Sequence, residues 1–244
     1  MDQFLQNLPA ETFTSMIVMF IVMIFSVIIF LKSKKVDPFK KPKGVMLIAE
    51  WLVSSIQNML ASNMGSYFRY LEPYFLTIML YIFIGFLFGL TGFPSPLSYY
   101  LNTFAVVLTA FVLIHFHALK TNGLRYFKRF IEPFVVFLPI NIVTVWTPLV
   151  SMSFRIFGNI LAGIILMTLL YGFLGYLSSI IFSFLPVGIN SLFLAPFIAP
   201  WLHMYFDLFS AFIQTIVFIS LAMLLIAQER PSNTSEKSED HATA

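Results

Sequence analysis

The fold is decided by residues 133–176, PFVVFLPINIVTVWTPLVSMSFRIFGNILAGIILMTLLYGFLGY, which contain one formal charge, Arg155. As a straight helix these 44 residues would be about 66 Å long, roughly twice what crosses the hydrocarbon layer of a membrane. A second stretch, residues 187–228, is 42 residues long and again holds one charge, Asp207. We therefore expect a strongly tilted or bent helix hairpin in a membrane. Bends are expected at the prolines of both stretches: Pro139, Pro148, Pro196 and Pro200.

The composition of the whole chain is that of a polytopic membrane protein. Of its 244 residues, 59% are hydrophobic, 18% aromatic and 10% charged, whereas soluble domains carry about 25% charged residues. The chain has no cysteine, which excludes disulfides, thiolate metal sites and thiol nucleophiles. His115 and His117 are two residues apart and do not share a helix face, so a metal site is not expected there. We expect no cofactor.

Three shorter apolar segments precede the hairpin and predict spans near residues 15–31, 73–90 and 98–119. Residues 45–64 instead place apolar side chains at helical spacing opposite a polar stripe, which predicts an interfacial helix. The predicted fold class is all-α: five transmembrane helices plus one interfacial helix, ending in the long tilted hairpin. Residues 1–230 are expected to form a single membrane domain, and the polar tail, residues 231–244, to be disordered.

The distribution of Lys and Arg predicts the orientation in the membrane. Six of the fourteen lie between Lys32 and Lys43, directly after the first apolar segment. A second cluster follows the third span: Lys120, Arg125, Lys128 and Arg129. Because cationic loops stay in the cytoplasm, the N-terminus is expected outside and the C-terminus inside. The net charge of +3 then reflects membrane flanks, and no nucleic-acid partner is expected. No Lys or Arg precedes the first span, which predicts a retained helix instead of a signal peptide.

Arg155 and Asp207 are the only formal charges among residues 133–228. An arginine near the bilayer centre costs about 2.5–3.5 kcal/mol on insertion scales, so this side chain is expected to face protein or an aqueous cavity. Its guanidinium stays positive where a lysine can neutralise. The alternative role for the two charges is a buried structural salt bridge, although such pairs seldom add stability.

Polar and small residues accompany Arg155 at helical spacing. Ser151 and Asn159 lie one turn before and after it, which predicts a polar stripe on one face of an apolar helix. Beside this stripe the small residues leave room for the close approach of another helix. They are Gly158, Ala162 and Gly163.

The last apolar segment has a second polar stripe. His203, Asp207 and Gln214 stand at i, i+4 and i+11, which predicts one shared face in a regular helix. His203 is either a hydrogen-bonding residue between helices or a proton relay. Asn102, near the outer end of its helix, is either a cap or interhelical hydrogen bond, or a residue of an access channel.

The run FRIFGNILAG, residues 154–163, resembles the signature of subunit a of the F-type ATP synthase, the stator protein beside the rotating c-ring. FIQTIVF, residues 212–218, resembles the last-helix motif of that family, and the resemblance covers about residues 31–228. It implies that Arg155 faces the c-ring carboxylate, that Asn159 is the polar residue one turn on, and that Gln214 lies opposite.

Two positions depart from the common bacterial pattern. Many bacterial members carry Glu directly after Ala-Gly, where this chain has Ile164. Mitochondrial members carry a carboxylate seven residues before the last-helix glutamine, which is the position of Asp207. The resemblance therefore implies that the last helix supplies the channel carboxylate, either without the histidine partner usual at the Ile164 position or with His203 in its place.

The function implied by the resemblance is ion translocation without bond chemistry in this chain. Protons are expected to pass from outside through a half-channel to the c-ring, with Arg155 between this path and a cytoplasmic exit. The expected path residues are Ser151, Asn159, Asn102, His203, Asp207 and Gln214. Expected partners are the c-ring, peripheral-stalk subunit b, the rest of the enzyme and lipid. The expected location is the bacterial plasma membrane, with the mitochondrial inner membrane as the alternative. A proton-coupled secondary transporter is the rival function, although we find no inverted repeat.

Overall fold

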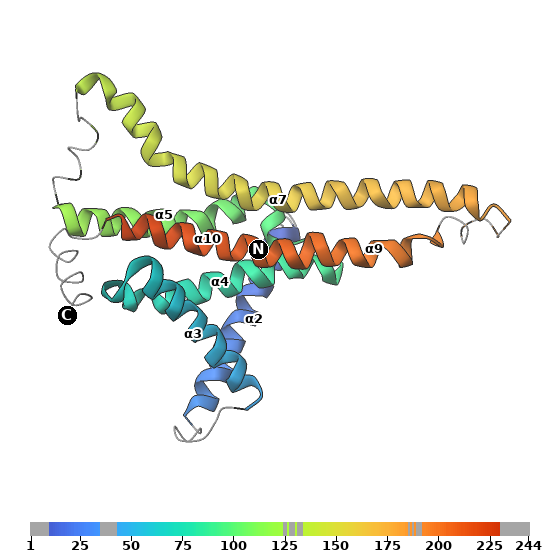
Figure 1. Ribbon diagram of the computed structural model, residues 1–244, viewed down its shortest axis with the longest axis horizontal. Helices are drawn as coiled ribbons and strands as arrows, with labels where there is room; N and C mark the ends of the chain where they lie inside the picture. Colours follow the sequence, from blue (N-terminus) through green and yellow to red (C-terminus); the bar gives the residue numbers. More distant parts are fainter. Residues whose placement is uncertain are drawn as a thin grey trace, which may run out of the picture. The chain divides into compact units, whose positions relative to one another are not determined.

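A computed structural model describes residues 10–34, 43–123, 126, 130, 134–184, 186, 188 and 192–229 (Figure 1). The described part of the chain consists of helices and short connections, with no strand. Six helical stretches in it are long and apolar enough to cross a membrane: 10–33, 45–64, 67–91, 100–122, 138–181 and 195–227. The predicted fold class, an all-α polytopic membrane protein, is confirmed.

The first predicted spans correspond to α2 (Ala10–Ser33), α4 (Glu72–Leu87) and α5 (Tyr100–Asn122). Most large apolar side chains of α2 are exposed, as expected for a helix surrounded by lipid. The cationic loop between Lys34 and Lys43 and the tail after Glu229 lie outside the described residues.

Helix α3 (Val45–Met64) has the bounds predicted for the interfacial helix. Its buried residues, Ala49, Ile56 and Leu60 among them, follow one face at helical spacing. Its hydropathy of 1.2 is the lowest among the six candidate spans. Its position at the membrane surface stays a prediction.

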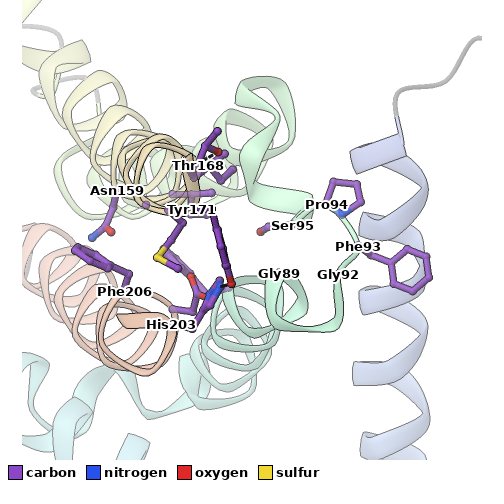
Figure 2. A pocket seen from close by; sticks show the side chains of 16 residues that line it. Gly89, Gly92, Phe93, Pro94, Ser95, Asn159, Thr168, Tyr171, His203 and Phe206 are labelled. Atoms are coloured by element: carbon purple, nitrogen blue, oxygen red, sulfur yellow. Dashed lines mark hydrogen bonds and ion pairs between the residues drawn. The ribbon is translucent and has the colours of Figure 1, made fainter. Parts of the chain in front are cut away.

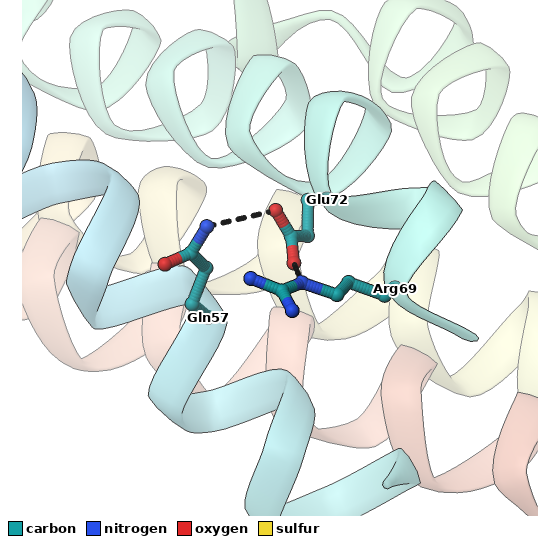
Figure 3. Close-up of polar contacts among 3 residues, drawn as sticks. All are labelled: Gln57, Arg69 and Glu72. Atoms are coloured by element: carbon teal, nitrogen blue, oxygen red, sulfur yellow. Dashed lines mark hydrogen bonds and ion pairs between the residues drawn. The ribbon is translucent and has the colours of Figure 1, made fainter. Parts of the chain in front are cut away.

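A polar cluster joins α3 to the beginning of α4 (Figure 3). Gln57 Nε2 donates to Glu72 Oε2 at 3.0 Å, and Arg69 Nε, from the short helix η1 (Ser66–Leu71), pairs with Glu72 Oε1 at 3.0 Å. The Arg69 side chain is 73% exposed, so this ion pair contributes at most about 1 kcal/mol. The cluster links α3 and η1 to Glu72, the first residue of α4.

The connection from α4 to α5 folds back onto the end of α4. It contains η2 (Phe88–Thr91) and η3 (Pro96–Ser98), and Gly92 between them has a φ of +85°, which favours glycine. Ser95 Oγ donates to the Gly85 carbonyl at 2.7 Å and accepts from the Leu97 N–H. These bonds hold the turn, which carries no charged side chain.

Helix α7 (Leu138–Ile181) is 44 residues long and follows the short helix η5 (Val135–Phe137). The predicted excess over one upright span is therefore confirmed. Pro148 lies inside this helix without ending it. Pro139 is the second residue of α7, in the first turn, where proline is tolerated.

The last predicted span is divided into α9 (Ala195–His203), a π-helical segment η6 (Met204–Phe209) and α10 (Ser210–Ala227). At the end of the π-helical segment, the Ser210 N–H donates to the Tyr205 carbonyl, five residues earlier. Such a turn contains an additional residue, so side chains after it are rotated away from the faces of a regular α-helix. The i, i+4, i+11 spacing therefore does not keep Gln214 on the face of His203 and Asp207.

The contacts of the chain group into two compact units, which we describe separately. Unit 1 comprises residues 1–22, 80–103 and 154–216. Unit 2 comprises residues 23–79, 104–153 and 217–244. In unit 1 the later part of α7 lies beside α9 (Figure 1), with cross-helix hydrogen bonds between them. The prediction of a single membrane domain stays a prediction.

Candidate functional site

Unit 1 has a half-open cavity of about 500 Å³ between α7, the π-helical segment and the turn after α4 (Figure 2). Its lining is mainly apolar, and several polar side chains line it as well. They are Ser95, Asn159, Thr168, Tyr171, His203 and Asp207. One water takes about 30 Å³ of liquid volume, so this cavity is large enough for several waters.

His203 and Asp207 form a hydrogen-bonded pair on the wall of this cavity. The distance from His203 Nδ1 to Asp207 Oδ2 is 2.6 Å, and their side chains are 33% and 25% exposed. They lie four residues apart, the spacing at which side chains of one helix meet. His203 and Asp207 therefore share a face, as predicted, and are also hydrogen-bonded to each other.

Tyr171 extends this pair across to α7. Its hydroxyl lies 3.0 Å from His203 Nε2, and Figure 2 shows both side chains directed toward each other. Sequence reasoning missed Tyr171 because it belongs to neither polar stripe and resembles the many aromatic residues of the apolar helices. Only its hydrogen bond distinguishes it from them.

Asn159 provides a second link between the two helices. Ser210 Oγ, at the beginning of α10, donates to Asn159 Oδ1 at 3.0 Å. Asn159 also lines the cavity, one turn after Arg155. The two helices that carry the predicted stripes are therefore linked by Asn159 and Ser210, and Asn159 and Asp207 line the same cavity.

Arg155 is exposed on α7 and does not line this cavity. Within the described ranges it has no hydrogen bond or ion pair, and Asp207 pairs with His203. The alternative of an Arg155–Asp207 salt bridge is therefore not supported. An arginine in an apolar segment of this length needs water or a polar partner, because exposure of its charge to lipid is costly.

The face of α7 that carries Arg155 is open. Ser151, Gly158 and Ala162 share this face at helical spacing and are exposed like Arg155. A Cβ atom added at Gly158 would meet nothing within 4 Å. The small residues are therefore not required for packing inside the described chain, and they leave a surface that a second helix can approach closely.

Gln214 lies on α10 with a side chain that is 5% exposed. Its Nε2 has no hydrogen-bond partner among the residues that the structure describes. A buried amide without a partner costs about 1–3 kcal/mol. The burial of Gln214 therefore does not stabilise this chain. A buried polar group of this kind calls for another explanation, of which a functional role is one.

Asn102 has a structural environment in unit 1. Its Nδ2 donates to the carbonyls of Glu11, at 3.1 Å, and Pro96, at 3.0 Å. It is not among the described residues that line the cavity. The geometry favours the interhelical hydrogen bond, which was one of the two predicted alternatives for this residue.

The two histidines of α5, both in unit 2, have different surroundings. His117 is 4% exposed, its Nδ1 lies 2.8 Å from the Leu113 carbonyl oxygen, and its Nε2 bonds the Tyr70 hydroxyl. His115 lines a separate small cavity. The two residues do not share a helix face, as their spacing predicts.

The fold and the site define a polytopic α-helical membrane protein with a hydrogen-bonded His–Asp pair in a half-open cavity and an arginine on an open helix face. The family described as ATP synthase A chain matches residues 12–227. ATP synthase subunit a of Mycoplasmoides gallisepticum is 30% identical over 241 residues, covering 90% of this chain and 77% of the relative. The same subunit of Mycoplasma genitalium is 31% identical, with 87% and 77% covered. That of Oceanobacillus iheyensis is 29% identical, with 79% and 80% covered.

The chain belongs to the ATP synthase A chain family. The resemblance seen in residues 154–163 and 212–218 is thereby confirmed. Membership of this family gives the chain a function in proton translocation, in the membrane sector of an F-type ATP synthase.

Proposed function

We propose that this chain provides two aqueous half-channels and the arginine that faces the carboxylate of each passing c-subunit, and so couples proton flow to rotation of the c-ring. The observation that carries the proposal is the position of Arg155. It is exposed, has no ion-pair partner among the described residues, and lies on an open face with small neighbours.

The outer half-channel is assigned to the cavity that contains Asp207. With the N-terminus outside, α7 runs toward the outer surface, so the residues after Arg155 belong to the outer half of the membrane. A proton from outside is taken up by Asp207, which is hydrogen-bonded to His203, and passes on to the c-subunit carboxylate. The size of the cavity and its polar lining support this assignment.

Arg155 acts through its permanent positive charge. Within a few ångströms of a c-subunit carboxylate it stabilises the ionised form, which favours release of the proton to the cytoplasmic side. The same charge repels a hydronium ion that would otherwise cross directly. The ring must then turn for charge to cross, and 100 mV supplies about 2.3 kcal/mol per proton to bias that rotation.

The proposed partners are the c-ring, the peripheral-stalk subunit b and the surrounding lipid. The open face around Gly158 and Ala162 supports close packing of c-subunit helices against α7. The bacterial relatives support location in a bacterial plasma membrane. The proposed orientation places the N-terminus outside and the C-terminus in the cytoplasm.

Cysteine crosslinking tests the docking face. We expect Ala162→Cys to form a disulfide with a cysteine on the outer face of the c-subunit helix, because Ala162 is exposed on the face of α7 that carries Arg155. Ile160→Cys is the matched control, since Ile160 is 8% exposed and points into unit 1. The measurement is the fraction of a–c dimer on a non-reducing gel of membranes that contain the assembled enzyme.

If neither Ala162→Cys nor a cysteine at Ser151 or Gly158 crosslinks to any c-subunit position, this face does not meet the ring. Crosslinking from Ile160→Cys at the same yield would likewise contradict the proposed orientation of α7.

A further inference from the structure

We propose that Tyr171 is a positioning residue of the outer half-channel, whose hydroxyl holds the His203 imidazole so that Nδ1–H donates to Asp207 Oδ2 and leaves Oδ1 as the oxygen that exchanges protons. This inference rests on the proposed function. The family comparison assigns no role to this tyrosine, and no sequence motif includes it.

Three polar groups from two helices form one continuous chain of hydrogen bonds. Tyr171 Oη and His203 Nε2 are 3.0 Å apart, and His203 Nδ1 and Asp207 Oδ2 are 2.6 Å apart. Tyr171 comes from α7, and the other two residues come from the end of α9 and from the π-helical segment (Figure 2). Among the described residues of this cavity, these three are the titratable ones.

The chemistry of the three groups assigns each proton. An ionised carboxylate only accepts hydrogen bonds, so the nitrogen of His203 that faces Asp207 carries a hydrogen. In a neutral imidazole the other nitrogen is then an acceptor, and the Tyr171 hydroxyl donates to it. Tyr171 therefore fixes the tautomer and the ring orientation of His203, as a hydrogen-bond partner of the second ring nitrogen does in other histidine sites.

The consequence for Asp207 is that its two oxygens differ. Oδ2 accepts the Nδ1–H of His203 whether or not the carboxyl group is protonated, so the imidazole does not change tautomer during transport. Oδ1 has no hydrogen bond to any residue within the described ranges. A proton from water of the half-channel binds Oδ1 and leaves from Oδ1 to the c-subunit carboxylate, which balances one proton taken up with one proton released.

Tyr171 and His203 also lie where two cavities meet. Both residues line the 500 Å³ cavity of Asp207, and both line a second cavity of about 860 Å³ whose walls are mostly apolar. The second cavity is bounded by Leu192 and Pro196, near the proposed outer end of the hairpin. Tyr171 and His203 thus lie between the second cavity and the carboxylate of Asp207.

A packing role alone does not require the Tyr171 hydroxyl. The chain contains 30 Phe and 10 Tyr, and phenylalanine would fill the same space on α7. Tyr176, five residues later on the same helix, is 68% exposed, and its hydroxyl has no hydrogen bond among the described residues. It therefore provides a matched control for loss of a tyrosine hydroxyl.

The test is passive proton flux through the assembled enzyme as a function of pH on the access side, in vesicles with an imposed potential. We expect Tyr171→Phe to slow flux at neutral pH about five- to tenfold, the loss typical of one hydrogen bond to a polar group. The dependence of flux on pH is also expected to change, because without the Tyr171 hydroxyl nothing fixes which nitrogen of His203 faces Asp207. Tyr176→Phe should leave the rate and the pH profile unchanged.

A double variant separates positioning from folding. If Tyr171 acts through His203, Tyr171→Phe should add no further loss in a His203→Ala background. An unchanged rate and pH profile in Tyr171→Phe would overturn the inference, and so would a loss that is equal in both backgrounds. Neither result affects the proposed function, which fails instead if Arg155→Ala retains ATP-driven proton pumping.

Discussion

Replacement of Arg155 by alanine is expected to abolish ATP-driven proton pumping while the enzyme still assembles. The Arg155 side chain is exposed and has no partner among the described residues. Its loss therefore breaks no hydrogen bond or ion pair with any of them. It does remove the charge that stabilises the ionised c-subunit carboxylate and blocks direct passage of hydronium. The measurement is acidification of inverted membrane vesicles after addition of ATP, with subunit recovery as the check on assembly.

Thr147→Val is the matched control for Arg155→Ala. Thr147 lies two turns earlier on α7, is exposed, and bonds only its own helix through the Val143 carbonyl. Its replacement should leave pumping intact. Passive proton flux supplies a second measurement, because a channel without the arginine should leak. Intact pumping in Arg155→Ala would reject the assigned role, and loss of the uptake of a solute would favour a secondary transporter.

Replacement of Asp207 by asparagine is expected to slow proton flux about a hundredfold, in the range seen when a proton-transferring group is removed. Asparagine keeps the shape of the side chain and can still accept the hydrogen bond from His203, but it carries no proton. Asp207→Glu should retain most of the flux, because the cavity of about 500 Å³ has space for one additional methylene group. Flux driven by an imposed potential measures all three proteins.

Tyr205→Phe is the control for this series, since Tyr205 belongs to the same π-helical segment and is 57% exposed. It should behave like the unmodified protein. Equal flux with aspartate, asparagine and glutamate at position 207 would remove this residue from the proton path. Loss of flux in Tyr205→Phe as well would indicate that the segment, instead of the carboxylate, is sensitive to change.

Several features of the fold could be predicted from the sequence because they depend on local composition. The insertion of a segment into lipid is determined by its own side chains, so the length of α7 and the bounds of α3 followed from the pattern of apolar residues. That Arg155 is the one charge of its segment, and that His203 and Asp207 share a helix face, followed for the same reason. An unpaired charge is visible in a sequence, and i, i+4 neighbours meet within one helical turn.

The contacts between helices could not be predicted from these patterns. The π-helical segment changes the face on which Gln214 lies, and spacing counted on a regular helix cannot include its additional residue. Asn102 is held by two carbonyls that come from other parts of unit 1, and Tyr171 reaches His203 from the facing helix.

The sequence by itself therefore determined which segments are long and apolar enough to cross a membrane and which charges stand alone within them, since these follow from the transfer of each segment from water to lipid. Only the tertiary structure decided which side chains share the cavity with Asp207. That choice depends on how each helix is rotated about its axis, and the rotation is set by packing between helices far apart in the sequence.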